Sequence, residues 1–217
     1  MRLTVEDLQQ SQGLKWRPYG ERGVLIALDE LASVHSLYRA VRSGDFVEEC
    51  VPGAQTLFVR QRDAAMSNGA LVRAIEELAA STSTHVAPPT RTHHVDVVYD
   101  GVDLHDVAIL TGLSVAELVR RHVAPTYIVA FLGFSRAFPY LVGLDRLLVV
   151  PRLASPRSSV PAGSVGMGAG FTGIYPASTP GGWRLLGHTD AVFFDENREP
   201  PSRLSPGDAV VFRAVDR

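Results

Sequence analysis

The stretch VPAGSVGMGAGFTGIYPASTPGGW, residues 160–183, decides how the second half of the chain folds. It contains the spacing GxGxxG, which begins at Gly168 and is typical of dinucleotide-binding loops. Such a loop binds pyrophosphate only where the glycine turn opens a helix, because the amides at the helix N-terminus contact the phosphates. Pro176 and Pro180 follow instead, and each lacks an amide hydrogen and breaks a helix. The stretch therefore does not predict a nucleotide-binding loop.

The same stretch is also unlike a flexible linker. Apolar residues such as Met167 and Ile174 recur among its glycines, whereas a solvated linker is rich in Ser and Gly and poor in apolar residues. The remaining interpretation is a set of strands joined by tight turns, in which glycine allows a positive φ or a close approach of two backbones. Either the glycines serve only the corners of a barrel, or their bare backbone lines a ligand cleft with Tyr175 and Trp183 as apolar walls.

Composition limits the class of protein. The chain has 217 residues, a net charge of -2 and 46% hydrophobic residues, which allows one or two domains with a real core. This charge gives no electrostatic footprint for nucleic acid. No apolar run approaches the ~18 residues of a membrane span, the N-terminus lacks an apolar signal region, and Cys50 is the single cysteine. We expect a cytoplasmic protein without nucleic-acid or membrane partners.

Residues 1–88 are predicted to form a small α/β domain. Residues 23–28 and 56–61 are short apolar runs typical of strands. Between them, Val34, Leu37 and Val41 recur at helical spacing. A polar, proline-bearing segment, residues 81–92, follows a second apolar helix pattern and marks the domain boundary.

Residues 89–217 are predicted to form a barrel or sandwich. Ser114 and Glu117 stand in a capping-box relation that opens a helix. Residues 125–134 are typical of a buried strand, and from residue 135 onward short apolar pieces alternate with Pro and Gly. The predicted fold class is α+β.

Five ordered blocks resemble one known family. They are FLGFSRAFPYLVGL, PRLASPRSSVPAGSVGMGAGFTGIYP, PGGWRLLGHT, FFDENREPP and LSPGDAVVF. They resemble the allophanate hydrolase subunit 1 family, which includes KipI and the B subunit of 5-oxoprolinase. The resemblance is dense over residues 94–212 and thinner before them. It implies a small N-terminal α/β domain, residues 1–88, and a cyclophilin-like β-barrel domain, residues 89–217.

The resemblance also implies a function. Family members work with an allophanate hydrolase subunit 2 partner, which is like the C subunit of 5-oxoprolinase, and with a lactam-utilisation protein, which is like its A subunit. Together these proteins convert 5-oxo-L-proline to L-glutamate with ATP, which we assign to the complex because this chain shows no complete nucleotide site. The alternatives are a KipI-like inhibitor of a sensor histidine kinase and an allophanate hydrolase subunit 1. A prolyl isomerase would rest on fold analogy alone.

Two residues are predicted to be catalytic. Opening a lactam requires activation of its carbonyl oxygen and groups that hold anions, for which Arg side chains are suited. Arg157 matches the family's second Pro-Arg, and His122 stands where the family has a His that would act as acid, base or donor near neutral pH. The alternatives are a surface salt bridge for Arg157 and a structural role for His122.

The remaining candidates are predicted to bind substrate through aromatic walls, hydroxyl groups or a second Arg and His. No spacing of Cys and His residues predicts a metal site. The predicted substrate-binding residues are Phe138, Tyr140, Arg152, Ser164, Phe171, Thr172, Tyr175, Trp183 and His188.

Three positions depart from the family pattern. Arg136 and Ala137 stand where the family has Pro-Gly, and Phe171 stands where it has Gln. Ala137 replaces a residue that accepts left-handed backbone, and Phe171 lacks the hydrogen-bonding amide. These changes lie inside the blocks that would carry the activity, and they favour the regulatory alternative.

Overall fold

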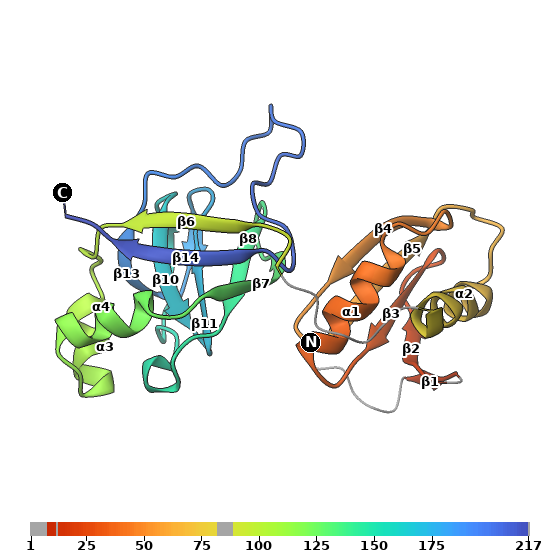
Figure 1. Ribbon diagram of the computed structural model, residues 1–217, viewed down its shortest axis with the longest axis horizontal. Helices are drawn as coiled ribbons and strands as arrows, with labels where there is room; N and C mark the ends of the chain where they lie inside the picture. The colour runs from red at the N-terminus through yellow and green to blue at the C-terminus, as the bar shows by residue number, and fades with distance from the viewer. Residues whose placement is uncertain (1–7, 12, 82–88, 217) are drawn as a thin grey trace. The chain divides into compact units, whose positions relative to one another are not determined.

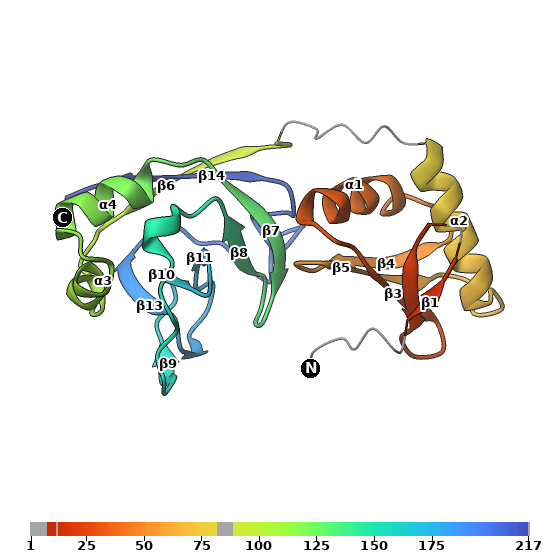
Figure 2. The same ribbon diagram turned by 90° about the horizontal axis from the view of Figure 1, so that it is seen from below.

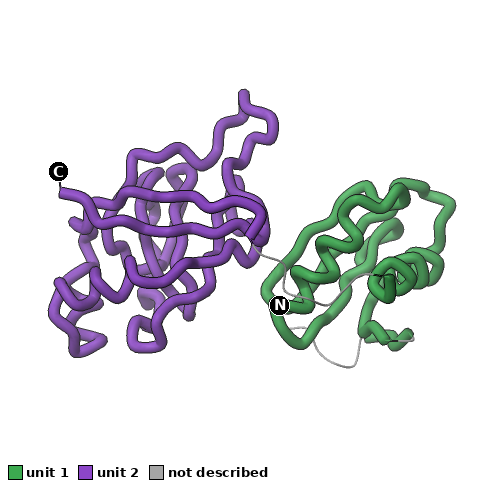
Figure 3. The backbone as a smooth tube through the Cα atoms, viewed as in Figure 1, with its two compact units in different colours: residues 1–88 green, residues 89–217 purple. Residues whose placement is uncertain are grey.

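The computed structural model describes residues 8–11, 13–81 and 89–216 (Figure 1). The chain divides into two compact units, residues 1–88 and 89–217, which Figure 3 colours separately. No helix within the described ranges is long and apolar enough to cross a membrane.

The first unit packs two helices against an antiparallel sheet. The helices α1 (Leu31–Val41) and α2 (Asn68–Ser81) contribute Leu37, Val41 and Ile75 to one core with the strands. The sheet has five strands in the order β1-β2-β3-β5-β4. Their bounds are β1 (Gln9–Gln10), β2 (Lys15–Pro18), β3 (Gly23–Ala27), β4 (Val47–Pro52) and β5 (Thr56–Gln61).

The second unit is built on a mixed sheet of seven strands in the order β13-β10-β11-β8-β7-β14-β6. Only the neighbours β14 and β6 run parallel in this order. Beyond β6 the chain reaches β13, where Val98 and His188 exchange two backbone hydrogen bonds of 2.9 Å that nearly close the sheet. The strands are β6 (Thr92–Val97), β7 (Tyr127–Gly133), β8 (Phe138–Val142), β10 (Ser164–Gly168), β11 (Phe171–Ile174), β13 (Arg184–His188) and β14 (Ala209–Ala214).

Two helices cover one end of this sheet (Figure 1), namely α3 (Leu104–Thr111) and α4 (Val115–Val123). The Ser114 hydroxyl accepts a hydrogen bond of 3.2 Å from the Glu117 amide, which confirms the predicted cap of α4. A short 3-10 helix, η2 (Arg146–Leu148), packs beside both helices. The observed architecture confirms the predicted α+β class with a barrel-like sheet.

The glycine-rich stretch is a β-hairpin. Strands β10 and β11 pair in antiparallel register and are joined by Ala169 and Gly170, whose φ angles are 53° and 83°. Two consecutive positive φ angles are typical of the type I′ turn that connects short hairpins. The GxGxxG spacing therefore spans a turn between strands and opens no helix.

A two-stranded sheet stands beside the larger one. It pairs β9 (Arg157–Val160) with β12 (Thr179–Gly181) in antiparallel orientation. Figure 2 shows β9 projecting away from the seven-stranded sheet. The residues at and around these two short strands form one wall of the site described below.

The turn between β7 and β8 contains a strained alanine, which gives a test of stability. Ala137 has a φ of 58°, in the left-handed region that costs a residue with a Cβ about 1–2 kcal/mol. We expect Ala137→Gly to stabilise the protein by about 1 kcal/mol, because relief of this strain exceeds the added chain entropy of glycine. Urea unfolding measures the change.

The control is Ala116→Gly in the exposed part of α4. There the same substitution acts on right-handed helical backbone, and we expect a loss of about 1 kcal/mol. Equal destabilisation by both substitutions would contradict the assignment of strain to Ala137.

Candidate functional site

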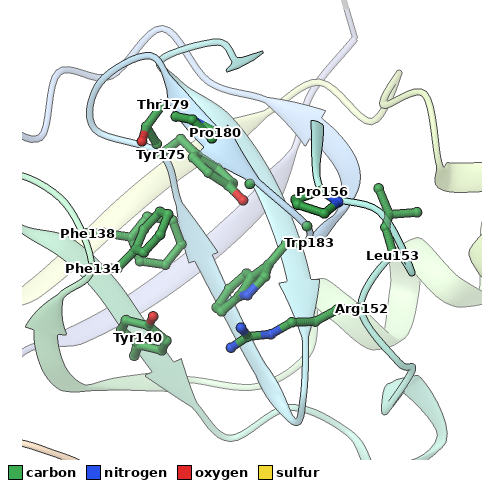
Figure 4. A pocket seen from close by; sticks show the side chains of 12 residues that line it. Phe134, Phe138, Tyr140, Arg152, Leu153, Pro156, Tyr175, Thr179, Pro180 and Trp183 are labelled. Carbon is green, nitrogen blue, oxygen red and sulfur yellow. The ribbon is translucent and has the colours of Figure 1, made fainter. Parts of the chain in front are cut away.

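An aromatic pocket of about 450 Å³ lies in the second unit (Figure 4). Strand β8 contributes Phe138 and Tyr140, and the segment between β12 and β13 contributes Trp183. The wall opposite is formed by Pro156, by β12 and by Gly182, which follows it. Pockets of this volume with apolar walls and few polar groups are typical of small-molecule sites.

Phe138 is the centre of the aromatic lining. Its ring makes edge-to-face contacts with Tyr175 and Trp183, at centroid distances of 4.9 and 5.0 Å. It makes two more with Tyr140 at 5.2 Å and Phe134 at 5.8 Å. Edge-to-face pairs fix the relative tilt of neighbouring rings. The walls of the pocket are therefore held in one arrangement before any ligand binds.

Glycines make this packing possible. A Cβ on Gly173 would lie 2.5 Å from the Pro139 carbonyl oxygen and 3.1 Å from the Phe138 ring. A Cβ on Gly181 would collide with the Tyr175 hydroxyl. The backbone of β11 and of β12 thus approaches the aromatic side chains more closely than any other residue type allows.

Arg152 is the single charged residue among the described residues that line the pocket. Figure 4 shows its guanidinium alongside the indole of Trp183. The guanidinium carbon lies 5.9 Å from the centroid of the Trp183 ring. Burial raises the pKa of Tyr140 above its usual value, although the Arg152 charge lowers it in part. Burial also raises the pKa of Tyr175. Near neutral pH the pocket therefore offers a cation and two neutral phenols, which together suit an anionic ligand.

The pocket gathers five of the predicted substrate-binding residues. The set of predicted substrate-binding residues omitted Phe134, an aromatic residue of the same block that lines the pocket, is 63% exposed and has a φ of 60°. It also omitted Pro156, which carries no chemical signal of its own, whereas Gly181 and Gly182 belong to the stretch whose bare backbone was one of the two alternatives for lining a cleft. The five gathered residues are Phe138, Tyr140, Arg152, Tyr175 and Trp183.

The other predicted substrate-binding residues lie outside this lining. Phe171 packs behind the wall, where its ring meets Tyr140 edge-on at 5.5 Å. Ser164 is buried in β10, and Thr172 is buried in β11. His188 pairs through Nδ1 with an Asp100 carboxylate oxygen at 2.8 Å. Their binding roles stay predictions.

Arg157 also lies outside the pocket lining. One guanidinium nitrogen donates to the buried Asp103 carboxylate at 2.7 Å, and another donates to the Trp183 carbonyl oxygen at 3.4 Å. The second oxygen of Asp103 accepts from the Leu185 amide at 2.7 Å. Arg157 therefore braces the segment that carries Trp183, and its predicted catalytic role stays a prediction.

His122 is fully buried. Its Nδ1 lies 2.6 Å from the Tyr99 hydroxyl oxygen and its Nε2 lies 2.8 Å from the Thr172 hydroxyl oxygen. The imidazole stacks on Phe212 with a centroid distance of 4.9 Å. Burial lowers the pKa of His122 to about 3. Both ring nitrogens are thus engaged inside the protein, and the predicted catalytic role also stays a prediction.

Metal ligands do not gather near these residues in the described part of the chain. Within residues 8–11, 13–81 and 89–216, no group of three His, Cys, Asp or Glu residues could hold a metal ion. Arg136, which departs from the family pattern, forms an exposed ion pair of 3.5 Å with Glu196 and lies 6.0 Å over Phe194. Its charge is directed to the segment that contains Phe194.

A family model matches most of the chain. The model for the carboxyltransferase domain, subdomain C and D, matches residues 14–204. The chain belongs to this family. The resemblance to the family that includes the B subunit of 5-oxoprolinase is thereby confirmed.

Curated relatives extend over most of the chain. The 5-oxoprolinase B subunit of Escherichia coli O157:H7 is 41% identical over 204 residues, which is 89% of this chain and 92% of that protein. The 5-oxoprolinase B subunit of Haemophilus influenzae is 37% identical over 206 residues, which is 90% of this chain and 95% of that protein.

Solved structures share the fold. TTHA0988 is 32% identical with a TM-score of 0.78 over 90% of this chain, which spans 40% of the length of that protein. PH0987 of Pyrococcus horikoshii is 35% identical with a TM-score of 0.57, over 93% of this chain and 97% of that one. The Kluyveromyces lactis urea amidolyase is 17% identical with a TM-score of 0.72 over 93% of this chain and 15% of its own, and it supports the fold alone.

The buried histidine predicts a loss of stability in acid. Unfolded His122 takes up a proton below about pH 6.5, whereas the folded group stays neutral down to a pKa of about 3. The unfolded state therefore binds more protons within this window, so stability falls as the pH is lowered through it. We expect the contribution of His122 to this slope to approach about 1.4 kcal/mol per pH unit below pH 6 and to be about half of that between pH 7 and 6, measured by urea unfolding at pH 7, 6 and 5.

The substitution His122→Asn should reduce this slope, whereas the matched control His105→Asn, on the exposed face of α3, should keep it. Nuclear magnetic resonance gives a second reading that needs no variant. An imidazole of His122 that titrates between pH 7 and 5 in the folded protein would contradict the prediction.

Proposed function

We propose that this chain is the B subunit of an ATP-dependent 5-oxoprolinase complex that hydrolyses the lactam of 5-oxo-L-proline to L-glutamate. The observation that carries the proposal is the aromatic pocket. Among the described residues that line it, Arg152 is the one that carries a charge. This pocket occurs in a chain that is 41% identical to a protein named as the B subunit of 5-oxoprolinase, over 92% of the length of that protein.

The pocket suits a small ring that bears a carboxylate. We assign the carboxylate of 5-oxoproline to the guanidinium of Arg152, which can hold it through two parallel hydrogen bonds. The flat ring then lies among Phe138, Tyr140 and Trp183. The phenol of Tyr140 stays protonated because burial raises its pKa, so it can donate to a ligand oxygen.

The nucleotide belongs to another part of the complex in this proposal. ATP bound elsewhere in the complex would supply the phosphoryl group that activates the lactam carbonyl oxygen, and addition of water with cleavage of the carbon–nitrogen bond would then leave glutamate, ADP and phosphate. Among the described residues, the GxGxxG spacing forms a hairpin turn and opens no helix that could hold phosphates. This chain therefore binds and orients the lactam in our proposal.

The lettered subunit in the relatives' names implies further subunits. We propose that one partner is a protein of the allophanate hydrolase subunit 2 type, like the C subunit of 5-oxoprolinase. The other is a lactam-utilisation protein like the A subunit. The proposed site of action is the cytoplasm. The regulatory alternative, inhibition of a sensor histidine kinase, is not favoured by the names of these relatives.

The proposal predicts a binding defect in an Arg152 variant. In the complex co-purified with its partner subunits, we expect Arg152→Gln to raise the KM for 5-oxoproline about 10- to 100-fold, because a charge-assisted pair is lost. Because Gln cannot replace the charge in either the ground state or the transition state, kcat should fall less than kcat/KM. The assay follows glutamate formation together with 5-oxoproline-dependent release of phosphate.

Arg146→Gln is the matched control, because Arg146 is an exposed arginine on η2 outside the pocket lining. Its kinetics should equal those of the unaltered complex. An intact complex without 5-oxoproline turnover would refute the proposed function. Full activity in Arg152→Gln would instead remove the assignment of the carboxylate to this residue.

A further inference from the structure

A chain of buried polar groups runs behind the pocket. The Tyr99 hydroxyl oxygen lies 2.6 Å from Nδ1 of His122, and Nε2 of His122 lies 2.8 Å from the Thr172 hydroxyl oxygen. The Thr172 hydroxyl donates to the Gly166 carbonyl oxygen at 3.0 Å. His122 and Thr172 are completely buried. None of these four residues lines the pocket.

The chemistry of the groups fixes the direction of every hydrogen bond. A hydroxyl has one proton, and Thr172 gives it to the Gly166 carbonyl oxygen. The Thr172 oxygen must therefore accept from a protonated Nε2 of His122. Neutral imidazole carries its proton on one nitrogen, so Nδ1 accepts the proton of the Tyr99 hydroxyl. The low pKa of His122 agrees with this neutral ring.

The described residues packed around the imidazole are aromatic and neutral. Phe212 stacks on its face at 4.9 Å, and Tyr127 lies beside it with a centroid distance of 5.6 Å. The Tyr127 hydroxyl donates to the backbone carbonyl of His122 at 2.7 Å. Desolvation by this packing is accordingly what lowers the pKa of His122. The hydrogen-bonded chain from Tyr99 to Gly166 therefore holds one tautomer of a neutral ring.

This hydrogen-bonded chain ends on the two strands beneath the aromatic lining. Thr172 stands in β11 between Phe171, whose ring meets Tyr140 at 5.5 Å, and Gly173, which lies under Phe138. Gly166 stands in β10 and pairs in register with Gly173. Because successive strand residues point to opposite faces, Thr172 is anchored on the barrel side while its neighbours support the pocket side.

We propose that Thr172 is a positioning residue, whose hydroxyl joins His122 to Gly166 and thereby fixes the β10–β11 backbone that supports the aromatic pocket. The identity of the ligand in this inference rests on the proposed function. Removal of the hydroxyl leaves Nε2–H of His122 without an acceptor and the Gly166 carbonyl without this donor. Buried groups without partners shift to find new ones, and the strands shift with them.

The test compares Thr172→Val, which keeps the shape and loses the hydroxyl, with Thr172→Ser, which restores it. In the co-purified complex we expect Thr172→Val to raise the KM for 5-oxoproline about tenfold with a smaller change in kcat. Thr172→Ser should recover most of the affinity. Thr189→Val is the matched control, since Thr189 is a buried threonine of the same unit whose hydroxyl accepts from the Ala191 amide at 3.3 Å.

A second readout is independent of turnover. The chain has two tryptophans, so in a Trp16→Phe background the fluorescence reports Trp183 in the pocket alone. We expect Thr172→Val to shift this emission and Thr189→Val to leave it unchanged. Nitrogen-15 chemical shifts should show the Nε2–H tautomer of His122 in the unaltered chain and in Thr172→Ser.

Three results would overturn the inference. They are an Nδ1–H tautomer in the unaltered chain, an unshifted Trp183 emission in folded Thr172→Val, and equal losses of affinity in the Val and Ser variants. Absence of 5-oxoproline turnover in the unaltered complex would count against the proposed function alone. The fluorescence and tautomer measurements would still decide the role of Thr172.

Discussion

The closure of the seven-stranded sheet is the constraint on which the second unit depends. An open sheet would leave the backbone groups of β13 and β6 unpaired at two edges. Much of the β13 edge is instead paired. Val98 pairs with His188, and the Gly101 amide then donates to the Leu186 carbonyl oxygen at 3.0 Å. A Cβ on Gly187 would collide with the Val98 carbonyl oxygen, so glycine is required at the junction. The same pairing brings the segment after β6 alongside β13. There the buried carboxylate of Asp103 accepts hydrogen bonds from the Leu185 amide and from Arg157, the first residue of β9.

The site inherits its rigidity from this closure. Asp103 accepts from the Leu185 amide, and Arg157 connects it to the carbonyl of Trp183, so one pocket wall is tied to the barrel seam. In our proposal, strands β10 and β11 beneath the aromatic lining are supported by the hydrogen bond between Thr172 and His122. Preorganised aromatic walls need little rearrangement when a ligand binds, which reduces the entropic cost of binding.

Local chemistry explains what the sequence could predict. Ser114 caps α4 because its hydroxyl and the Glu117 amide are near neighbours in the chain, and the prolines after Gly173 exclude a helix without any tertiary contact. The sequence did not predict helix α3. Exposed apolar residues such as Ile109 occupy its solvent side, so its apolar residues do not recur at the spacing of a one-sided helix. The burial of His122 follows from contacts across the barrel, which no local pattern encodes.

The three departures from the family pattern can be judged by where their side chains lie. Phe171 packs on Tyr140 from behind, so it replaces hydrogen-bonding capacity with apolar support outside the lining. Arg136 lies outside the pocket lining and contacts Phe194 and Glu196. Ala137 adopts the left-handed backbone that the family pattern serves with glycine, so the turn keeps its shape at a cost in strain. Since none of these three residues lines the pocket, they leave its contact surface unchanged and give no physical reason to favour a purely regulatory role.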